Sequence, residues 1–210
     1  MKCLNQATVS VAVIAIGSLA ACSSASGTPQ DQRATPDPAQ RKSAQPDMPL
    51  LTSFREPSEV GRWMVINDGV MGGMSKSSLL ARPGSASFVG TVSAENGGGF
   101  ASIRNLFKKP VGEGLQAVAL RVRGDGKRYQ FRIRTNKRWD GPAHFRTFDT
   151  KAGTWQNVVL PLAEFQASYR GRHLSNVAPL ESGAVQQIGF LIADEQYGSF
   201  DLEIDSISLL

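Results

Sequence analysis

From Leu51 to its C-terminus, this sequence is built of short stretches in which apolar and polar residues alternate. Tyr129, Phe131 and Ile133, for example, are separated by single polar residues, and the same period of two recurs along the chain. Successive side chains of a β-strand point to opposite faces of a sheet, so this period is typical of strands with one buried face. No segment keeps a 3.6-residue apolar period over three turns. The chain is therefore expected to fold mainly as β-sheet.

The alternating stretches predict an all-β fold, an antiparallel jelly-roll sandwich. Many short strands at regular spacing, each bounded by Gly, Pro, Asn or Asp, favour this class. Residues 161–165 are compatible with one helical turn, and no internal repeat is visible. Strands are expected near residues 51–55, 62–67, 77–82, 85–93, 99–104, 115–123, 127–135, 143–149, 154–160, 186–193 and 199–209.

The first 21 residues predict a signal peptide that is not part of the fold. A positive charge at Lys2 precedes an apolar run over residues 7–20, shorter than the roughly 20 residues that span a bilayer. The run ends in Leu-Ala-Ala-Cys at residues 19–22, which resembles a bacterial lipobox, where the Cys22 sulfur accepts a diacylglycerol. Acyl chains such as palmitate on Cys22 would hold the protein at a membrane. An uncleaved anchor helix is the alternative, and in both cases the domain is exported.

The expected organisation is a signal peptide over residues 1–21, a lipidated Cys22 with a disordered tether over 22–50, and one jelly-roll domain over 51–210. Residues 23–49 contain five prolines, no aromatic residue and a single large apolar side chain, Met48. Such a stretch cannot bury enough apolar surface to offset its ordering entropy. We expect the protein in the cell envelope, lipid-anchored on the periplasmic or outer side of a membrane, and Ser23 favours the outer membrane.

Cysteine and histidine are too scarce in the expected domain for most metal or nucleophile chemistry. Cys3 and Cys22 both precede it, and the only histidines are His144 and His173. The domain therefore has no thiol for a disulfide, a zinc site or a cysteine nucleophile. No Gly-x-Ser-x-Gly motif exists, which argues against a Ser-His-Asp triad. We expect no enzymatic activity, no cofactor and no metal.

A row of carboxylates on the last expected strand is the feature that most suggests catalysis. Asp201, Glu203 and Asp205 alternate with apolar residues, so they are expected on one face. Neighbouring acids on such a face stand about 6.5–7 Å apart, which overlaps the roughly 6.5–9.5 Å between the carboxylates of inverting glycosidases. Any strand with alternating acids produces this spacing, so a hydrolase is a minor alternative.

Arginines gather on two neighbouring expected strands. The residues between these strands, Gly124-Asp125-Gly126, predict a tight hairpin with positive φ at both glycines. If the apolar residues of this hairpin face the core, its opposite face carries Arg121, Arg123, Arg132 and Arg134.

Two interpretations of this arginine face are open. Residues 101–150 hold 12 basic and 4 acidic side chains, whereas residues 181–210 hold 6 acidic and no basic ones. The arginines and the carboxylate row are then either neighbours that neutralise each other, or some arginines are free to bind an anionic or polyhydroxylated ligand in a groove. Nucleic acid is not expected as a partner, because the domain is exported.

Several loop residues are predicted to have structural roles. Gly72 and Gly73 would set turn conformations after the strand near 62–67, and Asp68 would cap backbone N–H groups. A calcium ligand is the alternative role for Asp68. Gly97-Gly98-Gly99 has no following helix, so a phosphate loop is not expected. The residues assigned to these structural motifs are Asp68, Gly72, Gly73, Gly98, Gly124 and Asp125.

The three tryptophans are expected in two environments. Trp63 and Trp155 follow strand patterns and are predicted to lie in the core, whereas Trp139 lies in a loop over residues 137–142 and is a candidate stacking platform. His144 is interpreted as a hydrogen-bonded structural residue. The candidate residues for binding a ligand or a partner are Arg121, Arg123, Arg132, Arg134, Trp139, Tyr169 and Arg170.

Six blocks of the sequence, taken in order, resemble the complex I intermediate-associated protein 30 family. Each block is weak evidence alone, but together they span nearly all of residues 51–209. The blocks are Trp63 with residues 67–75, residues 95–104, residues 123–126 with Tyr129, Trp155 with Pro161 and Phe165, residues 169–172, and residues 188–192 with Gly198, Phe200 and residues 204–207.

The resemblance implies a galactose-binding-like jelly roll, related to carbohydrate-binding modules, and a non-enzymatic role. Mitochondrial members of the family help to assemble respiratory complex I, the NADH:ubiquinone oxidoreductase. They act in the matrix, which corresponds to the bacterial cytoplasm, whereas the lipobox of this chain directs it across the membrane. We therefore expect a protein-binding or assembly-factor-like module of the envelope. The alternative is a carbohydrate-binding module for envelope or external glycans, with Trp139, Tyr169, Arg132 and Arg134 lining its groove.

Overall fold

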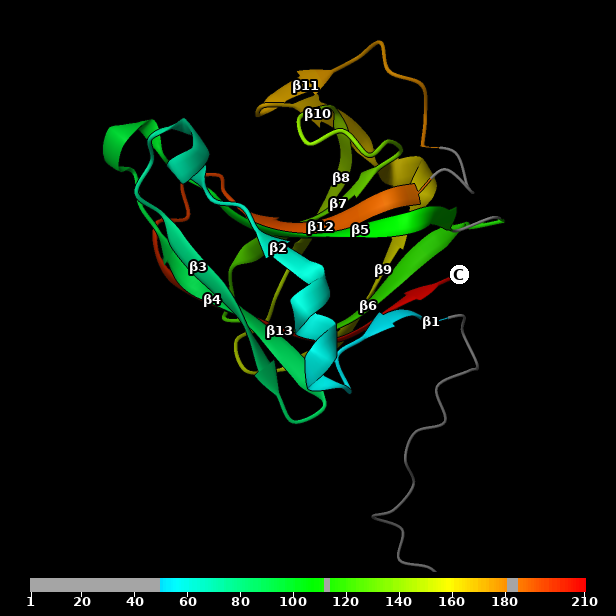
Figure 1. The fold of residues 1–210 in the computed structure, drawn as a ribbon, viewed down its shortest axis with the longest axis horizontal. Helices are drawn as coiled ribbons and strands as arrows, with labels where there is room; N and C mark the ends of the chain where they lie inside the picture. Colours follow the sequence, from blue (N-terminus) through cyan, green and yellow to red (C-terminus); the bar gives the residue numbers. More distant parts are fainter. Residues whose placement is uncertain (1–49, 112–113, 181–184) are drawn as a thin grey trace, which may run out of the picture. The chain divides into compact units, whose positions relative to one another are not determined.

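The computed structural model describes residues 50–111, 114–180 and 185–210, which form two antiparallel β-sheets (Figure 1). Cys22, the expected signal peptide and the tether up to residue 49 lie outside these residues. In the part of the chain that is described, no helix has the length and apolar character needed to cross a membrane. The helical segments there are short 3₁₀ turns, η2 (Pro57–Arg62), η3 (Asp68–Met71), η4 (Glu95–Gly97) and η5 (Leu162–Glu164).

Sheet A is centred on the longest strand of the fold, β13. Its strand order is β3-β4-β13-β6-β9, and β1 also pairs with β13. On β13, Phe200, Leu202 and Ile204 are buried, while Asp201 and Glu203 face outward, so the predicted alternation is confirmed. The strands of sheet A are β1 (Leu50–Ser53), β3 (Lys76–Arg82), β4 (Ser85–Val92), β6 (Ala117–Arg123), β9 (Trp155–Pro161) and β13 (Gly198–Leu209).

Sheet B has seven strands in the order β11-β10-β8-β7-β12-β5-β2 (Figure 1). Every stretch in which a strand was predicted contains one, and the all-β antiparallel class is confirmed. Two strands, β10 and β11, were not predicted, because they have only four and three residues and too few positions to show alternation. The strands of sheet B are β2 (Trp63–Val65), β5 (Ala101–Val111), β7 (Arg128–Arg134), β8 (Ala143–Asp149), β10 (Gln166–Tyr169), β11 (Arg172–Leu174) and β12 (Val185–Ile192).

The core between the sheets is a continuous series of aromatic contacts. Phe190 of β12 lies at its centre, with its ring 5.2 Å from that of Phe131 and 6.2 Å from that of Trp63. Through Phe148 and Tyr129 the series reaches Phe200 of sheet A, and Phe200 packs edge-on against Phe88 at 4.8 Å. Because these rings interlock across both sheets, they fix which residues of each strand point outward.

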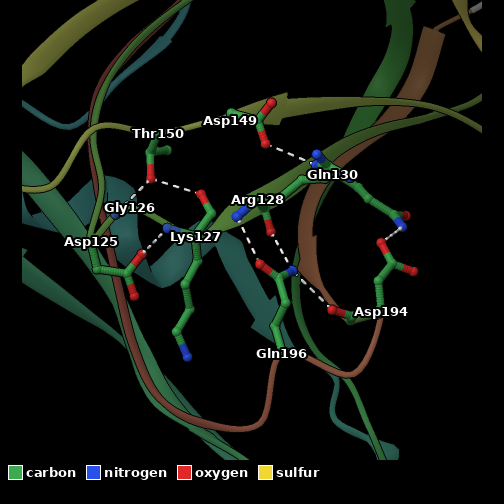
Figure 2. A network of polar contacts seen from close by, with 10 residues as sticks. Asp125, Gly126, Lys127, Arg128, Gln130, Asp149, Thr150, Asp194 and Gln196 are labelled. Carbon is green, nitrogen blue, oxygen red and sulfur yellow. Dashed lines mark hydrogen bonds and ion pairs between the residues drawn. The ribbon is translucent and has the colours of Figure 1, made fainter.

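The expected hairpin at Gly124-Asp125-Gly126 is wrong, because β6 and β7 belong to different sheets. The connection between them is held by side chains instead (Figure 2). Thr150 Oγ1 accepts a hydrogen bond from Gly126 N at 3.1 Å and donates to Lys127 O at 2.8 Å. Gly126 has the expected positive φ of 94°, but Gly124 does not. Glycine is required at 124 because a Cβ there would overlap the Thr150 side chain.

Asp125 joins this connection to both sheets. Its Oδ1 accepts hydrogen bonds from Lys127 N at 3.0 Å and from the buried hydroxyl of Tyr129 at 2.9 Å. Its Oδ2 accepts one from Asp201 N of β13 at 3.1 Å. Burial, followed by the nearby charge of Asp125, raises the pKa of Tyr129 above its ordinary value. The carboxylate therefore ties the start of β7 to sheet A without a hairpin.

The prediction that Trp155 lies in the core is wrong. Trp155 begins β9 on the outer face of sheet A, and its ring lies under the guanidinium groups of Arg121 at 5.3 Å and Arg123 at 5.1 Å. Trp63 is buried as predicted. Both tryptophans lie in stretches with a period of two. This period separates the two faces of a strand but does not show which face is buried in the core.

Asp68 is the centre of the loop that links β2 to β3. Its side chain is 2% exposed, and its carboxylate accepts hydrogen bonds from Ser75 N at 2.9 Å, Gly99 N at 2.7 Å and Phe100 N at 3.2 Å, as well as from the Ser75 hydroxyl. A Cβ at Gly98 would lie 2.6 Å from Asp68 Oδ2, so the loop closes only over glycine there.

Two more glycines shape this loop. Gly72 follows η3 with a φ of 93°, a conformation that favours glycine. Gly73 has an ordinary φ, but a Cβ there would overlap the Asp68 carboxyl carbon. One carboxylate thus orders two segments that lie about thirty residues apart in the sequence.

Replacement of Asp68 by Asn tests this carboxylate, because an amide nitrogen cannot accept the hydrogen bonds that Oδ2 receives. We expect Asp68→Asn to lower the free energy of unfolding at pH 7 by about 2 kcal/mol. Burial alone would raise the pKa of Asp68, but the hydrogen bonds from Ser75, Gly99 and Phe100 outweigh it and hold the pKa below 3.8. The contribution of the Asp68 carboxylate to the free energy of unfolding is therefore complete above pH 3.8. It is lost as the pH falls through the lower pKa of the folded state, since the unfolded chain binds the proton first.

Urea unfolding of wild type and Asp68→Asn at pH 7 and pH 3, monitored by tryptophan fluorescence, measures the difference in their free energies of unfolding. Asp149→Asn is the control, because the one side-chain contact of Asp149 within the described residues is an exposed ion pair with Arg128, and this variant is expected to change the free energy of unfolding little. Equal stability of wild type and Asp68→Asn at pH 7 would contradict the assigned role.

Candidate functional site

The outer face of sheet B carries a groove of about 920 Å³. Its floor consists of outward residues of β5, β12, β7, β8 and β10, and loops form its walls. In the central row, register places Arg104 of β5 opposite Gly189 of β12, and Gly189 opposite Arg132 of β7. Phe145 of β8 lies opposite Arg132 and continues the row. The same alternation that buries Ile103, Phe190 and Phe131 thus directs two arginines into one groove.

Gly189 makes the floor low between the two arginines. A Cβ at this position would overlap the carbonyl oxygen of Ile103 on β5, so no larger residue fits without a shift of the backbone. As a result, the side chains of Arg104 and Arg132 border a position that holds only main chain. A ligand that enters the groove can approach this main chain between two guanidinium groups.

The loop between β7 and β8 forms one wall and is fixed from the floor. Arg104, 8% exposed, donates from its Nη1 to Trp139 O at 2.9 Å, and its guanidinium lies 5.4 Å from the Trp139 ring centre. Gln187 of β12 donates to Asn136 O at 2.6 Å and to Arg138 O at 3.1 Å. Trp139 itself remains 59% exposed. The floor therefore holds the loop by its backbone and leaves the indole accessible.

The loop between β10 and β11 closes the same end of the groove. Tyr169 donates from its hydroxyl to Asp140 Oδ2 at 3.0 Å, and Arg170 forms an ion pair with the same carboxylate. These contacts, first of all the hydrogen bond from Arg170, hold the pKa of Asp140 below its ordinary value. Two loops that carry candidate binding residues are thus joined to each other through Asp140.

The arginines of the floor lie in an unfavourable electrostatic environment. Burial, together with the charge of Arg104, lowers the pKa of Arg132 to about 10. Burial and the charges of Arg104 and Arg132 lower the pKa of Arg134 to about 9. Among the described residues, Arg132 Nε and Arg134 Nε are buried without a hydrogen-bond partner. Arg132 and Arg134 therefore stay cationic at pH 7, and each has an Nε–H group without a partner.

Arg132 is partly satisfied by its neighbours. It donates to Gln130 Oε1 at 3.2 Å and to Ser168 Oγ at 3.0 Å, and it lies 5.8 Å from the ring centre of Phe145. These contacts orient the guanidinium across the groove floor. They involve neutral groups, so they do not neutralise its charge.

The Asp68 loop forms the opposite rim. Val70 and Met71 of η3 are 65% and 68% exposed and line the groove together with residues 97–99. The hydrogen bonds from Gly99 and Phe100 to Asp68 hold these two segments against each other. One rim of the groove is therefore apolar, whereas the floor is cationic.

The structure brings together five of the seven candidate binding residues. Arg132, Arg134, Trp139, Tyr169 and Arg170 all line the groove. The expectation that Arg121 and Arg123 share their face is wrong, because β6 lies in sheet A.

On the outer face of sheet A, Arg123 is paired with a carboxylate. Its Nε donates to Glu203 at 2.9 Å, so the neutralising interpretation holds for this arginine. It does not hold for Arg132 and Arg134, for which no ion pair is found among the described residues. The acidic row of β13 therefore lies on the other sheet from the groove.

Arg104 was not predicted as a site residue. It lies on β5, 28 residues before Arg132, and the two meet only because both strands pair with β12. The outward position of Arg104 is visible in the alternation with Ile103, but its neighbour across the sheet is not. Strand order was the missing information.

In the part of the chain that is described, no three His, Cys, Asp or Glu side chains cluster. Both carboxylate oxygens of Asp68 accept hydrogen bonds from protein donors, which does not favour the alternative role as a calcium ligand. His144 is buried, with its Nε2 3.1 Å from Ala178 O, in agreement with a structural role.

Comparison with known proteins identifies relatives by sequence. A sequence model of the family described as complex I intermediate-associated protein 30 matches residues 52–204. The mitochondrial complex I intermediate-associated protein 30 of Mus musculus is 29% identical over 181 residues. The alignment covers 76% of this chain and 55% of the mouse protein, so the chain spans about half the length of this curated relative.

Comparison of structures finds the same fold in carbohydrate-active proteins. A family 11 carbohydrate-binding module from Clostridium thermocellum, solved with a β-1,3-1,4-mixed-linked tetrasaccharide, has a TM-score of 0.59 at 14% identity over 77% of this chain and 94% of the module. An agarase matches with a TM-score of 0.52 at 11% identity over 76% of this chain and 24% of the enzyme. At these identities the likeness establishes the fold alone.

Replacement of Arg134 by Gln tests whether the buried arginine charges of the groove destabilise the folded protein. The change removes a buried donor without a partner and one of three like charges, so we expect Arg134→Gln to raise the free energy of unfolding by about 1 kcal/mol at pH 7. Arg123→Gln, which breaks the ion pair with Glu203 on the other sheet, is the control and should lower it by about 0.5 kcal/mol. Chemical denaturation of the three proteins measures both effects.

The gain from Arg134→Gln should depend on pH. Because the folded pKa of Arg134 is lowered to about 9, the folded wild type loses this proton on rising pH before the unfolded chain does. The penalty is therefore complete below pH 9, and the advantage of the variant should shrink above it. An Arg134→Gln variant less stable than wild type at pH 7 would contradict this account.

Proposed function

Because this chain belongs to the complex I intermediate-associated protein 30 family, we propose that it is a non-catalytic binding module that holds a protein partner in the groove of sheet B. The mouse relative takes its name from an intermediate of complex I, and an assembly-factor-like role is the extension of that name to this chain. The partner is expected to be a protein of the cell envelope.

The groove is the observation that carries this proposal. It combines a cationic floor, an apolar rim at Val70 and Met71, and the exposed ring of Trp139. Arginine and large aromatic residues are enriched where proteins bind one another, and methionine adapts to partners of different shape. Hydrogen bonds hold both walls in place, so little ordering is required on binding.

The proposal includes export and a lipid anchor at Cys22. The lipobox resemblance and the proline-rich residues 23–49 support it. A module on such a tether would act close to a membrane surface, at a distance that the tether sets. An envelope partner that is itself bound to the membrane would then meet the groove at a high effective concentration.

A carbohydrate-binding module is the second candidate. The shared fold with a family 11 module and the exposed indole of Trp139 favour it. Against it, the rings of Trp139, Phe145 and Tyr169 each lie beneath an arginine guanidinium, at 5.4, 5.8 and 5.4 Å. Each of these rings therefore has one face occupied by a cation, which reduces the surface for stacking of sugars.

Metabolic labelling with palmitate tests the anchor. Wild type should incorporate the label and sediment with membranes, while Cys22→Ser should do neither, because the serine hydroxyl cannot replace the acylated sulfur. Cys3→Ser is the control and should behave as wild type, since residue 3 belongs to the predicted signal peptide. Wild-type protein that incorporates no palmitate and remains in the soluble cytosolic fraction would contradict the anchor.

Cross-linking in native membranes, followed by affinity purification of the full chain, tests the function. We expect a stoichiometric protein partner with wild type and at least a tenfold lower yield with Trp139→Ala, since a buried aromatic contact at an interface contributes about 2 kcal/mol. Trp155→Ala, which alters an aromatic residue of the outer face of sheet A, is the control and should retain the partner.

Mixed-linked β-glucan fragments are added to a parallel capture. Recovery of the partner in their presence supports the protein-binding function. If no stoichiometric partner is recovered and the immobilised chain retains the glucan, the second candidate replaces the first.

A further inference from the structure

We propose that Arg104, Arg132 and Arg134 form a subsite for a carboxylate, and that the protein partner presents an extended acidic segment to it. This inference rests on the proposed function and adds the chemistry of the partner. The three arginines come from β5 and β7, on either side of β12, and line one groove. Arg104 and Arg132 flank the low floor at Gly189, and Arg134 lies two residues further along β7.

Among the described residues, no carboxylate forms an ion pair with Arg104, Arg132 or Arg134. Of the carboxylates that line it, Asp140 is paired with Arg170, and Glu164 with Arg146 at 2.7 Å. Asp194 accepts a hydrogen bond from Gln130 at 3.3 Å. These acidic groups therefore make their direct contacts with other side chains, and Asp140 and Asp194 act on the three arginines only through their charge. That charge does not offset burial and the charge of Arg104, which together lower the pKa of Arg132 and Arg134.

The unsatisfied donors indicate where an anion would bind. Arg132 Nε and Arg134 Nε are buried without partners among the described residues, and the two side chains lie two positions apart on the same face of β7. A guanidinium binds a carboxylate through two parallel N–H···O bonds, which a neutral sugar hydroxyl cannot reproduce. A carboxylate here would satisfy these donors and reduce the repulsion among the three cations.

The surroundings of the subsite favour a peptide over an acidic glycan. The rim at Val70 and Met71 is apolar and highly exposed, which suits large aliphatic side chains next to the acidic one. The rings of Trp139 and Phe145 already stack under Arg104 and Arg132, which leaves less ring surface for sugars. A segment in which acidic and aliphatic residues alternate matches both the floor and the rim.

Calorimetric titration of the purified full chain with synthetic peptides tests the subsite. The probes are a ten-residue peptide of alternating leucine and glutamate, and the same peptide with every glutamate replaced by glutamine. We expect the glutamate peptide to bind at least about tenfold more tightly, and less tightly as salt rises. Equal affinity of the two peptides would overturn the subsite.

Two matched double variants locate the binding. Arg132→Gln with Arg134→Gln should lose at least about tenfold in affinity for the glutamate peptide, whereas Arg121→Gln with Arg123→Gln on sheet A should bind as wild type. The thermal unfolding temperature of the first variant should be no lower than that of wild type, which separates loss of binding from loss of fold. Undiminished binding by the folded groove variant would overturn the assignment.

A third titration uses oligogalacturonate, which presents carboxylates on a sugar backbone. Binding of oligogalacturonate more tightly than the glutamate peptide would overturn the peptide and assign the subsite to acidic glycans. The capture experiment keeps the two proposals distinct. A partner retained by Arg132→Gln with Arg134→Gln contradicts the subsite but not the function, whereas peptide binding without any captured partner supports the subsite and contradicts the function.

Discussion

The aromatic contacts between the two sheets are the constraint on which the rest of the structure depends. Phe190, Phe131 and Trp63 of sheet B interlock with one another and connect through Tyr129 to Phe200 of sheet A. Once these rings are buried, the residues that alternate with them on each strand must point to the opposite face of the sheet. Arg104, Arg132 and Arg134 must face outward on sheet B, as Arg121 and Arg123 must on sheet A. The groove chemistry is thus a consequence of core packing.

Alternation in the sequence was sufficient to predict the longer strands and most of their inward residues, because both depend on local periodicity; it missed the short strands β10 and β11 and placed Trp155 in the core. It could not predict which strands are neighbours. Gly124-Asp125-Gly126 has the composition of a hairpin turn, yet β6 pairs with β13 and β9 in one sheet, and β7 pairs with β12 and β8 in the other. The same missing information explains why Arg104 was overlooked and why Arg121 and Arg123 were assigned to the wrong face. Strand order is decided by contacts between residues far apart in the sequence.

Asp68 illustrates a similar limit at the level of single residues. An aspartate followed by glycines predicts a turn, and the structure has one there. The donors that reach its carboxylate, Gly99 and Phe100, lie 31 and 32 residues further along the chain and are not recognisable as partners from either segment alone. The need for glycine at 73 and 98 is also tertiary, because a Cβ would meet the carboxylate itself. The loop that carries the apolar rim is therefore built from two distant segments and one buried charge.

The electrostatic state of the groove links stability to binding. Like charges at Arg104, Arg132 and Arg134 disfavour the folded protein in the absence of a ligand, and these three residues form no ion pair among the described residues that would relieve this repulsion. An anion on the floor would bind the folded state alone, since the unfolded chain does not bring the three arginines together. Occupancy would then add to the stability of the domain in proportion to the logarithm of ligand concentration. A surface selected only for stability would pair these arginines directly with carboxylates, as sheet A pairs Arg123 with Glu203. That sheet B does not is the strongest structural reason to assign the groove to a partner.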